Sequence, residues 1–170
     1  MIIPENLFFA SEKIKGIEFN IYSTAIGIRK INMNESGDIA NTSKLTRLRT
    51  DDPYMFSVFD QLKEYFSWER TLFEVPVDLK GTEFQLKVWN LLLKIPYGKT
   101  QTYKYLAKRL GNEKLIRAVG RAVGSNPVPV IIPCHRVLGS DGKLTGYSGG
   151  VGIKEKLLEL EGSKSLELFE

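Results

Sequence analysis

The middle of the chain contains three successive helical patterns, and they constrain the fold more than any other feature. The TEFQ run at 82–85 matches a capping box, and apolar residues follow it at helical spacing until the Pro96-Tyr97-Gly98 break. Thr102 can cap a short helix that ends by Gly111, and a second helix is expected from about Lys114 to Gly124. Two short helices joined by a glycine-containing turn predict a helix-turn-helix, although many helical hairpins bind nothing.

The first 80 residues predict a separate unit of strands and one helix. The runs GIEFNIY at 16–22 and GIRKINM at 27–33 alternate as strands do, with a short turn between them, so we expect a β-hairpin. Residues 34–50 are polar, and Asp51-Asp52-Pro53 then supplies a helix start. That helix runs to about Ser67, and its expected core residues are Phe56, Phe59, Leu62, Tyr65 and Phe66. Residues 75–81 have the character of an extended linker.

Cys134 and His135 are the only cysteine and the only histidine, and they are neighbours. A thiol reacts as the thiolate, and its free pKa near about 8.5 leaves only a few per cent ionised at neutral pH. His135 and Arg136 can supply the base or the positive charge that raises this fraction. Cysteine is also among the most commonly buried residues, and the apolar run before it suits a core, so an inert packing role stays open.

A base next to the nucleophile in sequence needs two further components. Successive side chains of an extended segment point to opposite faces, so we expect a water to bridge Cys134 and His135. The imidazole also needs a carboxylate or carbonyl to hold its tautomer. A last helix is expected from about Gly152 to Glu161, with Ile153, Leu157 and Leu160 as its apolar stripe. Its Glu161 falls at the edge of that stripe and is the candidate, although a glutamate at a helix end is commonly solvated.

Charge is distributed unevenly along the chain. The net charge is +4, but residues 1–80 carry −2 and residues 81–170 carry +6. Residues 87–143 hold eleven basic residues against Glu113 and Asp141, a net charge of +9. Counterion release makes such a segment suited to a phosphate-rich partner such as nucleic acid. A solvated face that aids solubility is the alternative.

The second helix of the helix-turn-helix has small residues beside arginines. Ala118, Gly120 and Ala122 permit close approach to the backbone, while Arg117 and Arg121 can reach phosphates or enter a duplex. Gly120 can alternatively be a packing glycine that contacts a neighbouring element.

Composition restricts the cellular setting and the cofactors. No apolar run approaches the roughly 18 residues that span a bilayer, and the N-terminus does not resemble a signal peptide. With one cysteine, we expect a protein of the reducing interior: cytoplasmic, or nuclear in a eukaryotic cell. One Cys and one His exclude a zinc site made only of these residues, and no metal or cofactor is expected. The segment Thr145–Gly150 is expected to form a loop over a pocket, with Ser148 near a ligand.

Six short motifs together resemble the O6-alkylguanine-DNA alkyltransferase family, from about Leu79 to Glu161. They are IPYGKT at 95–100, Tyr103, RAVG at 117–120, Asn126-Pro127, IPCHRV at 132–137 and GYSGG at 146–150. The resemblance implies an α+β protein with a ribonuclease-H-like α/β domain at 1–78. A mainly helical DNA-binding and catalytic domain at 79–165, with the helix-turn-helix, and a tail at 166–170 would follow.

This resemblance also implies the reaction. A methyl or larger alkyl group on guanine O6, and on thymine O4, would be transferred irreversibly from DNA to Cys134, so each molecule would act once. His135 would be the water-mediated base and Glu161 its orienting carboxylate. Asn126 would hold the turn before the active-site segment, and Tyr103 would donate to guanine N3. Two rival functions are a cysteine-dependent hydrolase and a DNA-binding regulator without chemistry.

Finally, the resemblance implies how DNA is bound. A monomer would enter the minor groove of double-stranded DNA and flip the O6-alkylguanine nucleotide into a pocket. Arg117 would fill the gap in the duplex, and Ala118 and Gly120 would allow the close approach. The other expected substrate or DNA contacts are Pro129, Arg136, Val137, Tyr147 and Ser148.

Overall fold

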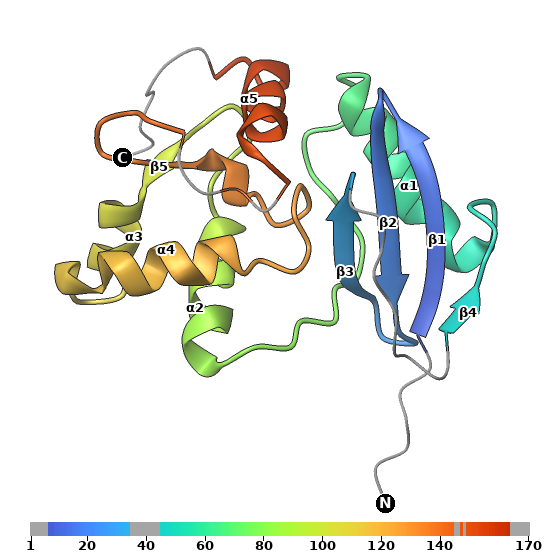
Figure 1. Cartoon of the computed structure of the whole chain (residues 1–170), viewed down its shortest axis with the longest axis horizontal. Coiled ribbons are helices and arrows are strands. Elements are labelled where there is room, and N and C mark those ends of the chain that lie inside the picture. The colour runs from blue at the N-terminus through green and yellow to red at the C-terminus, as the bar shows by residue number, and fades with distance from the viewer. Residues whose placement is uncertain (1–6, 35–44, 145–146, 148, 164–170) are drawn as a thin grey trace, which may run out of the picture. The chain divides into compact units, whose positions relative to one another are not determined.

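The computed structural model describes residues 7–34, 45–144, 147 and 149–163, with only the backbone described at Tyr54 and Phe56. The chain divides into two compact units, Met1–Leu79 and Lys80–Glu170 (Figure 1). The first unit combines a sheet with a helix and the second is mainly helical, so the expected α+β class is confirmed.

The first unit is built on a four-stranded sheet in the order β3-β2-β1-β4. Its strands are β1 (Leu7–Ile14), β2 (Ile17–Ser23), β3 (Ile28–Met33) and β4 (Leu45–Arg47). The predicted hairpin is confirmed as β2 and β3, which pair antiparallel. The sequence reasoning missed β1, which pairs antiparallel with β2, and β4, which pairs parallel with β1. The turn between β1 and β2 is tight, because Lys15 and Gly16 both adopt positive φ, at 47° and 84°.

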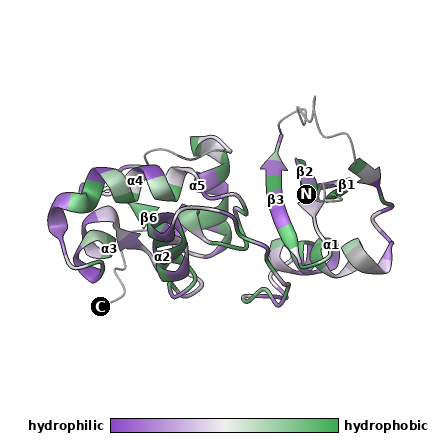
Figure 2. Cartoon of the chain, turned by 90° about the horizontal axis from the view of Figure 1, so that it is seen from below, coloured by the Kyte–Doolittle hydropathy of each residue, from purple (hydrophilic) through white to green (hydrophobic). Residues whose placement is uncertain are grey.

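Helix α1 (Pro53–Phe66) lies against one face of this sheet (Figures 1 and 2). The predicted start at Pro53 is confirmed, since proline suits the first helical turn. Phe59, Leu62, Tyr65 and Phe66 are buried as expected. The expected core position of Phe56 lies outside the described side chains.

The predicted linker at 75–81 is in part a component of the first unit. Val77 forms a parallel bridge with Ile28, and the carboxylate of Asp78 accepts hydrogen bonds from Thr24 and Arg29. These contacts tie residues 77 and 78 to the sheet edge, so the extended backbone there is ordered by pairing.

The second unit contains α2 (Glu83–Leu92), α3 (Tyr103–Arg109), α4 (Ile116–Gly124) and α5 (Val151–Leu160). The predicted capping box is confirmed: Gln85 N donates to Thr82 Oγ1 at 3.2 Å, and Thr82 N donates to Gln85 Oε1 at 2.9 Å. Thr102 caps α3 by accepting from Tyr105 N at 3.0 Å. The helix predicted from Lys114 begins instead as a 3₁₀ turn, η1 (Glu113–Leu115), which leads into α4.

Two sets of contacts position α4 and the segment around Cys134. Trp89 of α2 is buried and donates from Nε1 to the Ala122 carbonyl of α4 at 2.8 Å. An added Cβ on Gly81 would lie 2.8 Å from the Trp89 ring, so this packing requires glycine there. Strand β5 (Gln101–Thr102) pairs parallel with β6 (Val137–Leu138), which connects the start of the helix-turn-helix to the residues after Cys134. In the part of the chain described, no helix is long and apolar enough to cross a membrane.

Replacing Trp89 with Phe is expected to lower the free energy of unfolding by about 1–3 kcal/mol, because the indole hydrogen bond and part of a buried ring are lost. Urea unfolding followed by circular dichroism measures this change. The matched control is Trp68→Phe, since Trp68 is 69% exposed, and it should change the free energy by less than about 0.5 kcal/mol. Equal losses in the two variants would contradict the role given to Trp89.

Candidate active site

Cys134 begins a short 3₁₀ turn, η2 (Cys134–Arg136), so the expectation of an extended segment at this point is wrong. The turn is set by backbone hydrogen bonds from Cys134 N to the Ile132 carbonyl at 2.8 Å and from Arg136 N to the Pro133 carbonyl at 3.1 Å. Both Cys134 and His135 are buried, with 2% and 0% of their surface exposed. Three residues of 3₁₀ helix are too few to leave a periodic signal in the sequence.

Asn126 ties the loop before Cys134 to the sulfur. Its Nδ2 donates to the Ile132 carbonyl at 2.8 Å and to Cys134 Sγ at 3.0 Å, while its Oδ1 accepts from Val128 N at 3.0 Å. Within this loop the β-branched Val130 adopts φ 75°, which is strained backbone for such a residue and costs on the order of 1–3 kcal/mol. The asparagine therefore both closes a strained loop and presents a donor to the thiol.

A buried carboxylate lies behind the imidazole. Glu161 Oε1 lies 2.9 Å from His135 Nε2 and accepts from Arg136 Nη2 at 2.8 Å. Its Oε2 accepts from Arg136 Nε at 2.9 Å and from Gly98 N at 3.1 Å. Burial opposes ionisation of Glu161, but the hydrogen bonds from His135 and Arg136 and the charge of Arg136 outweigh burial and lower its pKa to about 2. The carboxylate is therefore ionised at neutral pH.

This pairing defines the state of His135. An ionised carboxylate only accepts hydrogen bonds, so the network assigns the imidazole proton to Nε2 and leaves Nδ1 as an acceptor. Among the described residues, Nδ1 has no hydrogen-bond partner and is buried. Burial lowers the pKa of His135, against the opposing effect of Glu161, so the ring is neutral at pH 7. A neutral imidazole with a free lone pair is suited to accept a proton.

The thiol itself is protonated at neutral pH in this structure. Burial raises the pKa of Cys134 to about 11, and the hydrogen bond from Asn126 and the charge of Lys154 offset part of that rise. The resting nucleophile therefore requires a base before it can react as a thiolate.

Lys154 of α5 was missed by the sequence reasoning. It is fully buried, and its Nζ donates to the Val137 carbonyl at 2.6 Å. Burial lowers its pKa to about 8, with the charge of Cys134 acting in the opposite direction, so the ammonium still predominates at pH 7. The signal was available: Lys154 is three residues before Leu157 and seven before Glu161, which places all three on one helix face.

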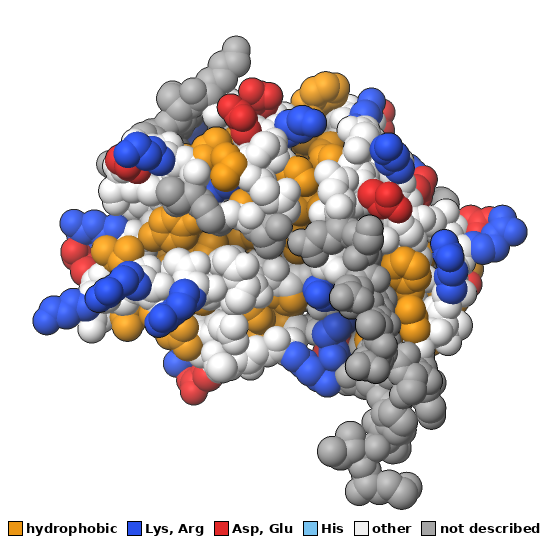
Figure 3. All heavy atoms as spheres, in the orientation of Figure 1, with side chains coloured by type: hydrophobic (Ala, Val, Ile, Leu, Met, Phe, Trp, Pro, Cys, Tyr) orange, Lys and Arg blue, Asp and Glu red, His pale blue; other side chains and the backbone are white. Residues whose placement is uncertain are grey.

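The exposed face of α4 carries arginines beside open space. Arg117 and Arg121 are exposed, and Figure 3 shows Lys and Arg side chains projecting where α3 and α4 lie in Figure 1. A Cβ built on Gly120 would have no neighbour within 4 Å, so the packing alternative for this glycine is wrong. Ala118 is half-buried, and so is Tyr103, the first residue of α3. The surface can therefore accept an external partner close to the helix backbone.

The remaining residues that were expected to contact substrate or DNA differ in how buried they are. Pro129, Arg136 and Val137 are buried. Arg136 was expected to contact substrate or DNA, but its guanidinium binds Glu161 and donates from Nη1 to the Ile95 carbonyl at 2.5 Å, because a buried cation needs such partners. Tyr147 is half-buried, and burial followed by the charges of Cys134 and Glu161 raises its pKa well above the usual value. Ser148 lies outside the described residues.

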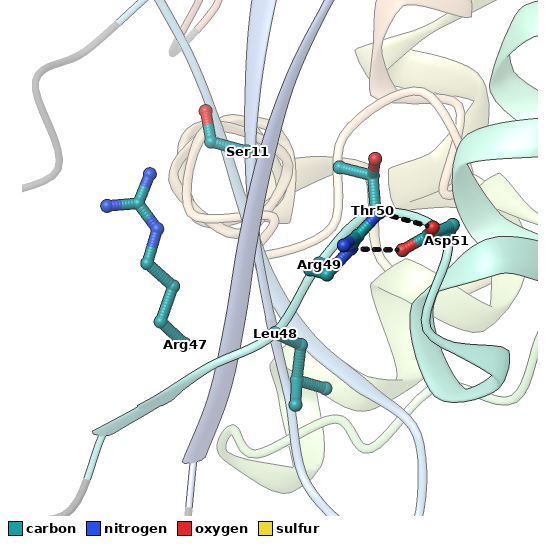
Figure 4. A pocket seen from close by; sticks show the side chains of 6 residues that line it. All are labelled: Ser11, Arg47, Leu48, Arg49, Thr50 and Asp51. Carbon is teal, nitrogen blue, oxygen red and sulfur yellow. Dashed lines mark hydrogen bonds and ion pairs between the residues drawn. The ribbon is translucent and has the colours of Figure 1, made fainter.

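A hollow in the first unit is unrelated to the Cys134 network. It has a volume of about 400 Å³ and is lined by Ser11 and residues 47–51 (Figure 4). Arg49 donates from Nε and Nη2 to Asp51 at 2.9 and 2.8 Å, and both side chains are exposed. The described residues contain no group of three Cys, His, Asp or Glu side chains that could hold a metal ion.

A helix-turn-helix with an open basic face and a buried cysteine beside a histidine–carboxylate pair defines a DNA-binding protein equipped for thiol chemistry. The family description "6-O-methylguanine DNA methyltransferase, DNA binding domain" matches residues 83–163, and its "ribonuclease-like domain" matches residues 18–79. The chain belongs to the 6-O-methylguanine DNA methyltransferase family.

Individual relatives agree with this assignment. The methylated-DNA--protein-cysteine methyltransferase of Mycobacterium tuberculosis is 52% identical over 125 residues, which cover 71% of this chain and 76% of that protein. The crystal structure of the M. tuberculosis O6-methylguanine methyltransferase superposes with a TM-score of 0.83 at 38% identity, covering 94% of each chain. A structure of M. tuberculosis OGT in complex with DNA gives a TM-score of 0.82 at 39% identity, covering 93% of this chain and 94% of that one.

Replacing Glu161 with Gln is expected to lower the free energy of unfolding by about 3–5 kcal/mol at pH 7, because Arg136 would remain buried without a counter-charge. The folded-state pKa of Glu161 is depressed from 4.5 to about 2, so its contribution is present above pH 4.5 and lost as the pH falls towards 2. Urea unfolding between pH 7 and pH 2 measures both effects. The stability of the variant should fall less steeply below pH 4.5 than that of the wild type; parallel curves would contradict this account. Glu83→Gln, which breaks an exposed pair with Lys87, is the control.

Proposed function

We propose that this chain repairs DNA directly, by transferring an alkyl group from guanine O6 to Sγ of Cys134. The observation that carries the proposal is the buried thiol of Cys134, which accepts a hydrogen bond from Asn126. The next residue, His135, has a neutral imidazole that is held by Glu161. A thioether formed on Cys134 has no route back to the thiol by proton transfer alone. Each molecule therefore acts once, and the protein is both the enzyme and the acceptor.

The reaction begins with loss of the thiol proton. Nδ1 of His135 accepts it through one water, and the carboxylate of Glu161 stabilises the imidazolium that forms. The donor on Asn126 and the ammonium of Lys154 stabilise the thiolate.

Alkyl transfer then exchanges one bond for another. The Cys134 thiolate attacks the alkyl carbon, a C–S bond forms, and the C–O6 bond breaks with its electron pair left on the base. The base becomes neutral guanine when it takes up a proton, so the thiol proton is balanced by the proton on the product. Tyr103 is the proposed donor at guanine N3, where negative charge accumulates as the bond breaks. The same chemistry on thymine O4 would use the same residues.

The proposed substrate is double-stranded DNA that carries O6-alkylguanine, bound through the minor groove by a monomer. A base inside the stack cannot reach a buried thiol, so the nucleotide is flipped out, which costs a few kcal/mol. Arg117 takes its place in the duplex, and Ala118 and Gly120 let the groove approach α4 closely.

Five further residues have proposed roles around the flipped base. Pro129 and Tyr147 shape the pocket, Ser148 contacts O6, and Val137 contacts the substrate or the DNA. Arg136 acts through Glu161. DNA binding and chemistry are assigned to a domain with proposed bounds 79–165, preceded by a domain at 1–78 and followed by a tail at 166–170.

The proposed location of this protein is the cytoplasm, or the nucleus in a eukaryotic cell, where it would meet this substrate.

Incubation with a duplex containing O6-methylguanine is expected to add one methyl group to Cys134 and nothing elsewhere. Intact-mass measurement followed by peptide mapping checks this, with Cys134→Ser as the control. Uptake should stop at one methyl per protein molecule. Product formation far beyond one equivalent would instead indicate a cysteine hydrolase, and DNA binding with no gain in mass would indicate a regulator without chemistry.

Gly120→Ala separates the DNA role of α4 from its folding role. Because the added Cβ meets nothing within 4 Å, the variant is expected to be more stable by up to about 1 kcal/mol, the difference in helix propensity. If duplex DNA approaches this face closely, affinity for undamaged duplex should fall several-fold in the same variant. Thermal unfolding and fluorescence anisotropy measure the two effects, and Gly152→Ala in α5, where a Cβ also meets nothing, is the matched control. Unchanged affinity would contradict close approach at Gly120.

A further inference from the structure

Glu113 bridges two lysines at the turn of the helix-turn-helix. Its Oε1 lies 3.1 Å from Lys108 Nζ and its Oε2 lies 3.4 Å from Lys104 Nζ. The three side chains are 49–57% exposed, so the cluster faces solvent. Glu113 is the only acidic residue between Glu83 and Asp141 in the sequence, so no other carboxylate of this segment can take its place.

The position of the cluster connects it to α4. Lys104 and Lys108 are four residues apart on α3 and therefore share one face of that helix. Glu113 is the first residue of η1, which Asn112 caps by accepting from Lys114 N at 2.9 Å, and η1 leads directly into α4. The cluster thus lies beside the element that carries Arg117.

Four other basic residues near this cluster have no described ion pair. Arg109, Lys114, Arg117 and Arg121 are exposed, and the contacts of the described residues include no ion pair for any of them. These four are available to an external anion in the free protein, whereas Lys104 and Lys108 are already paired. A carboxylate between two ammonium groups presents one negative charge through oxygen atoms, as a DNA phosphodiester does.

We propose that Lys104 and Lys108 form a binding site for a backbone phosphate of duplex DNA, and that Glu113 occupies this site in the free protein as an internal competitor. The inference rests on the DNA-binding function proposed above. Although an exposed ion pair is weak, Glu113 is held beside both lysines by the chain, so on undamaged DNA it keeps them occupied and a phosphate does not take the site. Glu113 thereby lowers the affinity for undamaged DNA, which favours release and continued search.

The test compares binding of a fluorescently labelled, undamaged duplex over a series of salt concentrations. Glu113→Gln frees one or two cations, so the slope of log K against log salt should steepen by about 0.9–1.8. When the salt concentration is lowered fourfold, the affinity of Glu113→Gln should rise about threefold more than that of the wild type for each extra phosphate contact. Anisotropy titration measures both quantities.

Two comparisons distinguish an internal competitor from a general change in charge. Glu83→Gln makes the same charge change on the same unit and also frees one lysine, Lys87, but on α2; it should alter the slope by less than half as much. Replacing Lys104 and Lys108 together by Gln should weaken binding little in the wild type and strongly in the Glu113→Gln background. Equal effects of the two glutamate variants would overturn the proposal, and so would equal effects of the lysine pair in both backgrounds.

Alkyl uptake reports on the proposed function separately. Neither Glu83 nor Glu113 touches the Cys134 network, so both glutamate variants should take up one benzyl group from free O6-benzylguanine at the wild-type rate, as measured by intact mass. Failure of the wild type to gain a methyl group from duplex DNA containing O6-methylguanine overturns the alkyl-transfer function, while the salt series still judges the role of Glu113. Circular dichroism melting of each variant confirms that the comparison is made between folded proteins.

Discussion

The hydrogen bonds to the buried carboxylate of Glu161 are the interactions on which the arrangement of the second unit's active site depends. It joins three segments that are far apart in the sequence: the turn at Gly98, the η2 turn at His135 and Arg136, and the end of α5. Removing a carboxylate and a guanidinium from water is unfavourable unless every remaining hydrogen-bonding position is satisfied. Here both oxygens are satisfied, and Arg136 also donates to the Ile95 carbonyl. The site is therefore correctly formed only when all three segments are in place.

This arrangement leaves the thiol protonated and buried in the free protein. Burial lowers the pKa of His135 and raises the pKa of Cys134 to about 11, so the imidazole stays neutral and the thiol stays protonated at pH 7. Oxidation of cysteine proceeds through the thiolate and requires exposure, and this thiol is buried as well as protonated. Such a resting state suits a nucleophile that can be used only once, because oxidation of Cys134 to the sulfonic acid would be as final as alkylation.

The sequence predicted the parts of the fold that have long or capped patterns. The hairpin β2–β3, helix α1, the capping box at Thr82 and the Thr102 cap all follow from local signals that the structure reproduces. The missed elements are short or unusual: β4 has three residues, η2 has three, and β1 lacks a clean alternation. Glu161 was found because its spacing from Leu157 was considered, whereas Lys154 was overlooked although it shares that face. Arg136 could not be placed, because its neighbours in sequence do not reveal that a distant carboxylate binds it.

The charge count of the sequence also overstates what the surface offers to DNA. The +9 of residues 87–143 already subtracts Glu113 and Asp141, but it still counts Arg136, which is buried on Glu161, and Lys87, which is paired with Glu83. The exposed cations with no described ion pair include Arg109 at the end of α3, Lys114 in η1, and Arg117 and Arg121 on α4. An external phosphate chain would therefore meet its readiest cations on and beside α4, the helix proposed above to enter the groove.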